Sequence, residues 1–154
     1  MLTRALHPSN AKLAELYEHD LSAWATQNAQ LLRQSQFDRI DIHNLAEELQ
    51  DMGRSERRAL ESFVQNVLMH LLKWQYQPQR RSDSWLDSIT DARTQIELAI
   101  ADSPSLKSYP AVQLKESYSR ARRQAAKQTG IQASAFPEEC PYAIELVLDE
   151  DWLP

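Results

Sequence analysis

The chain has 154 residues, of which 42% are hydrophobic and 25% charged, and its formal net charge is −5. These values are typical of a globular protein that buries a core, and they argue against a disordered chain. Two glycines and one cysteine make a glycine-rich phosphate loop, an internal disulfide and an all-cysteine zinc site untenable. A composition rich in helix formers predicts an all-α protein.

Apolar residues at helical spacing predict a single-domain helical bundle over residues 1–154. Prolines, a glycine and the Ser-x-x-Asp cap at Ser84 mark the ends of its segments. About five helices are expected, at 9–35, 41–75, 84–102, 110–129 and 141–148.

The second helix is expected to be long. Ile42 and Leu60 lie 18 residues apart, which is five whole turns at 3.6 residues per turn, so the apolar stripe keeps one phase across Gly53. A break at Gly53, with Ser55 capping a new helix, is the alternative, because glycine costs a helix about 1 kcal/mol relative to alanine. Continuity of phase favours one helix.

The stretch HLLKWQYQPQRRSDSW, residues 70–85, is expected to form the turn between the second and third helices. In a purely structural interpretation, Trp74 and Trp85 close the end of the core, and Lys73 complements the helix dipole. In a functional interpretation, this turn is a binding surface. Its candidate residues are His70, Lys73, Trp74, Arg80 and Arg81, joined by Arg122 and Arg123.

Three polar residues are candidates for chemistry. Asp20 falls on the apolar stripe of the first helix, and a buried carboxylate there predicts an ion pair with Arg57 or Arg58. Glu48 and His70 lie at the edge of the second stripe. A hydrolase or metal-dependent enzyme could use all three residues as acid, base or ligand.

The same residues argue against that alternative. Glu48 and His70 are 22 residues apart, or about 33 Å along a continuous helix at 1.5 Å per residue. The sequence also has neither a Glu-x-x-His nor an HExxH motif. We therefore expect no metal and no cofactor.

Charge is distributed unevenly along the chain. All 17 Lys and Arg residues lie at or before Lys127, and six acids follow it. The acidic end could fold over basic helices, but a solvated tail is the simpler expectation. Basic patches at 73–81 and 120–127 suggest weak nucleic-acid binding as a further alternative, against which stands a sequence pI near 5.4.

The first twenty residues contain no apolar run of the length that a signal peptide or a membrane-spanning helix needs. We therefore expect a cytoplasmic protein without a membrane partner.

Several motifs point to a known family. YEHDLSAW, DIHNLAEELQDMGRSERRALES, HLLKWQYQP, FPEECPY and LDEDWLP closely resemble the bacterial family catalogued as domain of unknown function 29. The likeness runs from Tyr17 to Pro154. It implies an all-helical fold and a bacterial setting, and it brings no activity, cofactor or catalytic residue.

The sequence by itself does not identify a biochemical activity. We expect a protein-interaction or binding module rather than an enzyme, with a protein as its partner. Self-association is compatible with this interpretation.

Overall fold

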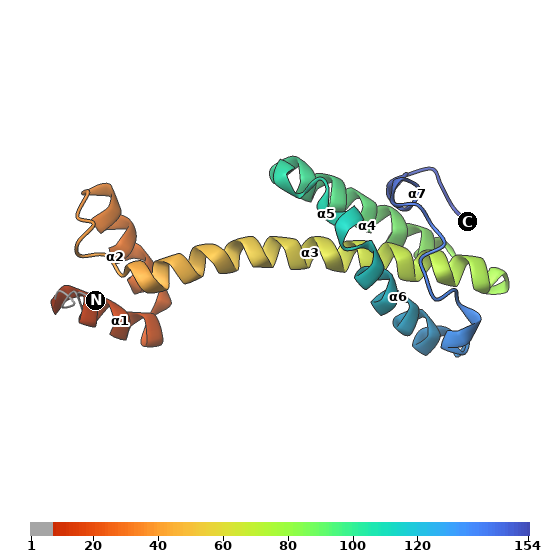
Figure 1. Ribbon diagram of the computed structural model, residues 1–154, viewed down its shortest axis with the longest axis horizontal. Helices are drawn as coiled ribbons and strands as arrows, with labels where there is room; N and C mark the ends of the chain where they lie inside the picture. The colour runs from red at the N-terminus through yellow and green to blue at the C-terminus, as the bar shows by residue number, and fades with distance from the viewer. Residues whose placement is uncertain (1–7) are drawn as a thin grey trace. The chain divides into compact units, whose positions relative to one another are not determined.

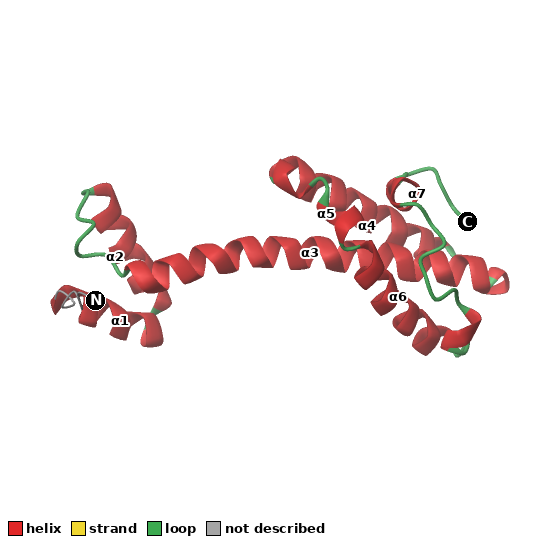
Figure 2. Ribbon diagram, viewed as in Figure 1, coloured by secondary structure: helices red, strands yellow, loops and turns green. Residues whose placement is uncertain are grey.

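The computed structural model describes residues 8–154 of the chain. Within this range every regular element is helical, and no strand is present (Figure 2). The prediction of an all-α fold is therefore confirmed. The described residues form seven α-helices rather than about five, because two of the predicted helices are divided.

The α-helices follow one another along the chain, and the connection between α6 and α7 is the longest (Figure 1). They are α1 (Pro8–His19), α2 (Leu21–Arg33), α3 (Ile42–Tyr76), α4 (Asp83–Asp102), α5 (Tyr109–Val112), α6 (Leu114–Thr129) and α7 (Ile144–Leu148). Single turns of 3-10 helix lie at Pro78–Arg80, Pro104–Leu106 and Ala133–Ala135.

Residue contacts divide the chain into two compact units. The N-terminal unit is Met1–Gly53, described from residue 8 onward, and the C-terminal unit is Arg54–Pro154. The long second helix is confirmed: α3 runs through Gly53 without a break, and its bounds differ by one residue from the predicted 41–75.

The first predicted helix is wrong at one point, because it ends at His19 and a new helix begins at Leu21. Asp20 between them has φ −152° and ψ 78°, outside the helical region, and its carboxylate accepts a hydrogen bond from the Ala23 N–H at 2.9 Å. An aspartate is a strong N-cap because it satisfies an amide that has no partner within the helix. The cap separates α1 from α2.

The N-terminal unit is held together by a buried polar network. Trp24 is almost wholly buried, and its indole Nε1 donates to the Asp41 carboxylate at 3.1 Å. The Asn28 side chain accepts from the Asp41 N–H and donates to the Trp24 carbonyl, both at 2.9 Å. Tyr17 stacks edge-on against Trp24, with ring centroids 5.0 Å apart. These bonds fix α2 against the start of α3.

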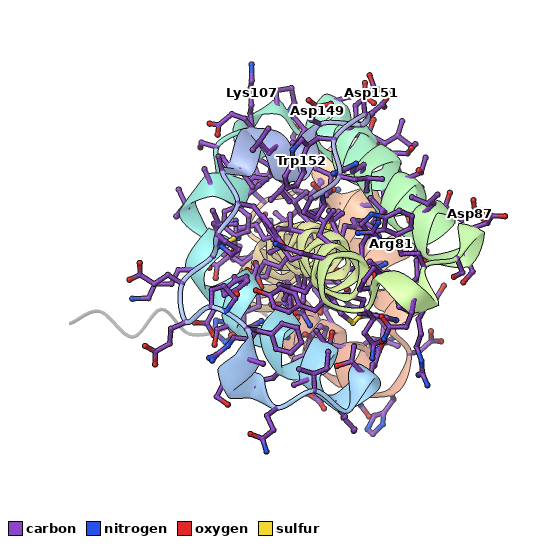
Figure 3. All side chains as sticks on the ribbon, turned by 90° about the vertical axis from the view of Figure 1, so that its right-hand side faces the viewer. Arg81, Asp87, Lys107, Asp149, Asp151 and Trp152 are labelled. Carbon is purple, nitrogen blue, oxygen red and sulfur yellow. The ribbon has the colours of Figure 1, made fainter. Side chains whose placement is uncertain are left out.

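The core of the C-terminal unit is built around the second half of α3. From Val67 to Lys73 every residue of α3 is buried, as expected for a helix surrounded by other elements. Figure 3 shows this helix in the middle of the C-terminal unit, with α4 on one side. Its main partners from other elements are Ile89, Ile96, Tyr118, Ala121, Ala125, Phe136 and Val147.

Arg93 ties the C-terminal segment to α4. This buried arginine donates from Nε to the Val147 carbonyl at 2.9 Å, and from one terminal nitrogen to the Trp152 and Leu146 carbonyls at 3.0 and 3.4 Å. Its other terminal nitrogen donates to the Glu150 carbonyl at 3.3 Å. One side chain thus satisfies four carbonyls at and beyond the end of α7.

The solvated acidic tail is therefore a wrong expectation. Val147 is wholly buried, and Tyr142 packs edge-on against Trp152 with ring centroids 5.4 Å apart. Asp149 and Asp151 remain exposed at the outer side of this segment, close to Trp152 (Figure 3). The acids are solvated, but the backbone that carries them is packed against the helices.

Three further boundaries differ from the sequence prediction. The third helix begins at Asp83 with Ser82 as its cap, so Ser84 is not the cap. The fourth is divided at Gln113, where φ −93° and ψ 3° interrupt the helix between α5 and α6. The short last helix begins at Ile144 rather than near Pro141.

Replacing Arg93 tests how far the C-terminal segment depends on it. Arg93→Ala should lower the free energy of unfolding by about 2 to 4 kcal/mol, because buried carbonyls lose their donor. The exposed Arg123→Ala is the matched control and should change it by less than about 0.5 kcal/mol. Urea unfolding measures both, and equal effects would contradict the structural role of Arg93.

The two glycines should respond in opposite ways to the same substitution. Gly130 ends α6 with φ 75°, and an added Cβ would meet nothing within 4 Å, so Gly130→Ala should destabilise by about 1 kcal/mol through backbone strain alone. Gly53→Ala should stabilise by up to about 1 kcal/mol, because Gly53 lies inside a helix. Thermal unfolding of both variants checks the signs.

Candidate functional site

The turn between α3 and α4 brings together several of the predicted binding residues. Pro78 opens a single 3-10 turn directly after α3, as the sequence indicates. The buried Gln77 side chain donates to the Thr129 carbonyl at 3.1 Å, which attaches the end of α3 to the end of α6. The turn is thus part of the packed C-terminal unit.

Lys73 is a buried cation. Its ammonium donates to the Gln128 side chain at 2.9 Å and lies 4.6 Å from the centre of the Trp85 ring. Burial disfavours the charged form and lowers the pKa of Lys73. The cation–π contact with Trp85 offsets part of the desolvation cost. Lys73 therefore acts in packing and is not available to a partner on the surface.

Arg81 covers the other tryptophan. Its Nε donates to the Trp74 carbonyl at 2.9 Å, and its guanidinium carbon lies 4.8 Å from the centre of the Trp74 ring. The expectation that Trp74 and Trp85 close the core is wrong, because both are half-buried and each has a cation on its face. Arg80 and Arg81 are exposed beside them.

His70 is buried one turn before this cluster. Its Nδ1 lies 3.0 Å from the Asn66 carbonyl, so Nδ1 carries a proton and donates. Burial lowers the pKa of His70; the bond to Asn66 acts in the opposite direction, and the charge of Lys73 lowers the pKa further. A neutral, buried histidine of this kind is a structural group rather than an exposed contact.

Arg122 and Arg123 lie on α6. Arg123 is exposed, whereas Arg122 is half-buried and its Nε has no hydrogen-bond partner among the described residues. The Arg122 charge lowers the pKa of Tyr118, but desolvation dominates and raises it to about 12. Within the described chain, no hydrogen bond joins either arginine to the turn.

The buried acid of the N-terminal unit is Asp41, and Asp20 is an exposed cap. The predicted pairing of Asp20 with Arg57 or Arg58 is therefore wrong. Glu48 accepts a hydrogen bond from the Tyr17 hydroxyl at 2.7 Å, which raises the pKa of Tyr17 to about 12. Across residues 8–154 no three His, Cys, Asp or Glu side chains form a group that could hold a metal ion.

A basic cleft in the C-terminal unit was missed by the sequence interpretation. It has a volume of about 370 Å³ and lies between α3 and the α5–α6 segment. The charged side chains that line it are Arg54, Arg57, Arg58, Arg120 and Glu61. The phenol of Tyr109 also lines it. The spacing of Arg54, Arg57 and Arg58 could have indicated a shared helix face.

A second cleft, of about 600 Å³, lies between α4, α5 and α7. Its walls are mainly apolar, from Ile96, Ile100, Pro110, Ile144 and Leu148. It exists because Arg93 holds the C-terminal segment against α4.

The N-terminal unit leaves part of its apolar stripe uncovered. Ile42, Leu49 and Met52 are 61%, 61% and 65% exposed, although their spacing predicts a core face. We call these three residues of α3 the N-terminal apolar face. The side of α3 that packs within the unit is instead the one that carries Glu48, which accepts the Tyr17 hydroxyl.

His70 predicts a pH dependence of stability. Its pKa is lowered in the folded state, so the unfolded chain binds the proton more readily. Stability is complete above the ordinary histidine pKa of about 6.5 and falls as the pH drops below it. His70→Gln should flatten urea-measured stability between about pH 7 and about pH 5.5. His43→Gln, an exposed control, should not; equal flattening would contradict the assignment.

No helix within residues 8–154 is long and apolar enough to span a membrane.

Comparison with known proteins gives one match. Neither the curated proteins nor the solved structures include a match to this chain. The family described as "Domain of unknown function DUF29" matches residues 16–153, which cover most of both units. The chain therefore belongs to the DUF29 family.

Proposed function

We propose that this protein is an interaction module whose N-terminal unit binds a basic amphipathic helix of a partner protein. The observation that carries the proposal is the N-terminal apolar face, Ile42, Leu49 and Met52. A bacterial, cytoplasmic setting is part of the same proposal.

The geometry of this face suits a helical partner. Ile42, Leu49 and Met52 follow one another at intervals of seven and three residues, so they lie along one side of a single helix. Covering the exposed part of each side chain should contribute about 1 to 2 kcal/mol. An amphipathic helix that lays its apolar side on such a row is a common mode of peptide recognition.

Charge selects the kind of helix. Residues 1–53 contain 4 Lys and Arg and 8 Asp and Glu, which gives 4 − 8 = −4. Glu47 and Glu48 lie on the same helix as the apolar face. A basic partner is attracted by this unit, whereas a second copy of the same unit carries the same charge and is repelled.

The alternatives have less support. The nucleic-acid interpretation needs free aromatic faces for base stacking, but Arg81 lies on Trp74, and Tyr76 packs edge-on against Phe136 at 4.8 Å. In the enzyme interpretation, Glu48 and Asp20 already serve as a hydrogen-bond acceptor and a helix cap. That the exposed Arg80 and Arg81 contact a partner stays a prediction.

A designed peptide tests the proposal. A labelled helical peptide with leucines on one face and lysines on the other should bind the full chain in fluorescence anisotropy, and added salt should weaken binding. Leu49→Glu should reduce the affinity at least about 10-fold, because it places a charge in the apolar contact. Leu98→Glu is the matched control, since Leu98 is exposed to 52% on α4 of the C-terminal unit.

Two results would contradict the proposal. One is an equal change of peptide binding in Leu49→Glu and Leu98→Glu, which would show that the peptide does not depend on the N-terminal apolar face. The other is a dimer in sedimentation equilibrium that Leu49→Glu converts to a monomer. In that case the face would join two copies of the chain.

A further inference from the structure

We propose that the cleft between α3 and α6 binds a small molecule through a diphosphate group. This proposal is independent of the N-terminal apolar face, because every residue that lines the cleft belongs to the C-terminal unit. Binding of a helix at the N-terminal apolar face does not require a basic cleft in the C-terminal unit.

The arginines of α3 are placed on one face by their spacing. Arg54, Arg57 and Arg58 stand at positions i, i+3 and i+4, and Glu61 follows one turn later. Like charges at such spacings destabilise a helix by about 0.2 to 0.5 kcal/mol per pair. Three arginines therefore share one face of α3 although their mutual repulsion destabilises the helix.

The opposite wall comes from elsewhere in the chain. Tyr109 lies at the start of α5 and Arg120 in the middle of α6, so the cleft joins three elements. Ser62 and Gln65, on the α3 side, add a neutral hydroxyl and amide. All but one of the polar side chains that line the cleft can donate hydrogen bonds, which is the chemistry that an anion requires.

The single carboxylate of the cleft is already engaged. One oxygen of Glu61 accepts from the Tyr109 hydroxyl, and the other lies 3.5 Å from a terminal nitrogen of Arg120. Arg120 also pairs with Glu116 on its own helix at 3.4 Å. Glu61 thus positions Tyr109 and Arg120, and little of its charge remains to neutralise Arg57 and Arg58.

Arg57 and Arg58 are exposed at the mouth of the cleft. Within the described residues neither makes a hydrogen bond or an ion pair. Two planar guanidinium groups without an acceptor, next to a polar hollow, are suited to binding phosphate oxygens in a bidentate manner.

Charge and size select the ligand. Arg120 is already paired with Glu61 and Glu116, whereas Arg57 and Arg58 show no carboxylate partner among the described residues. Two such guanidinium groups can bind the oxygens of both phosphates of a diphosphate group, whereas one phosphate offers fewer oxygens. The cleft volume of about 370 Å³ is within the range of small-ligand sites and too small for a folded partner. Its lining is polar, so the phosphates rather than an apolar body would make the contacts.

Isothermal titration of the full chain tests this site with three probes: inorganic pyrophosphate, adenosine diphosphate and inorganic phosphate. Pyrophosphate should bind saturably, and more tightly than phosphate. Binding of adenosine diphosphate as well would identify a nucleoside diphosphate as the ligand, and its absence would identify free diphosphate. Arg57→Gln and Arg58→Gln should each weaken pyrophosphate binding about 10-fold, because each removes charge-assisted bonds.

Matched variants separate a site from general attraction. Arg123→Gln removes the same charge from an exposed position on α6 outside the cleft, and it should change the affinity less than about 2-fold. Glu61→Gln should strengthen pyrophosphate binding, because it removes the one negative charge, while it lowers thermal stability through the weakened Arg120 contact. Leu49→Glu should leave pyrophosphate binding unchanged.

The proposal is overturned by any of three results: no saturable binding of pyrophosphate at millimolar concentration, equal losses in Arg57→Gln and Arg123→Gln, or displacement of pyrophosphate by a short RNA at lower concentration. The last result would assign the cleft to nucleic acid. Because helix binding is measured with the peptide and diphosphate binding with pyrophosphate, failure of this proposal leaves the helix-binding proposal to be decided separately.

Discussion

The four hydrogen bonds from Arg93 are the constraint on which the C-terminal unit depends. A short helix such as α7 has several carbonyls without a partner inside the helix, and burying them against α4 would be costly. Arg93 supplies donors to those carbonyls and to the loop that follows. This allows Val147 and Tyr142 to reach the core, and it forms the wall of the apolar cleft. The acidic residues of the segment stay outside, where they remain hydrated.

The two units use different physical means of cohesion. In the C-terminal unit, apolar side chains surround α3 from Leu60 onward. In the N-terminal unit, Trp24, Asn28 and Asp41 are joined by directed hydrogen bonds, and the apolar side chains of α3 lie largely outside. A core of this kind specifies geometry well but covers little apolar surface. The surface left uncovered is what makes the first unit a candidate for binding.

The parts of the fold that could be predicted were those with periodic sequence patterns. The phase relation of Ile42 and Leu60 was sufficient to predict α3, and Gly130 marked the end of α6. The break at Asp20 was missed, because an aspartate on an apolar stripe is equally compatible with a buried ion pair and with a cap. Arg93 lies on the apolar stripe of Ile89 and Ile96, but its role could not be predicted. Its four acceptors are backbone carbonyls that lie 53 to 59 residues further along the chain, and backbone acceptors leave no pattern in a sequence. The basic cleft was missed for the same reason, since Tyr109 and Arg120 join it only through packing.

The separation of Arg93 from its acceptors also bears on synthesis at the ribosome. The bonds among Trp24, Asn28 and Asp41 span at most 17 residues, so they can form as soon as α3 begins to emerge. The bonds of Arg93 cannot be complete until Trp152 has left the exit tunnel. During that interval α4 carries a guanidinium without its acceptors, beside apolar residues that α7 will later cover. Chains that stall in this interval expose that surface, and such nascent chains are the ones that chaperones engage.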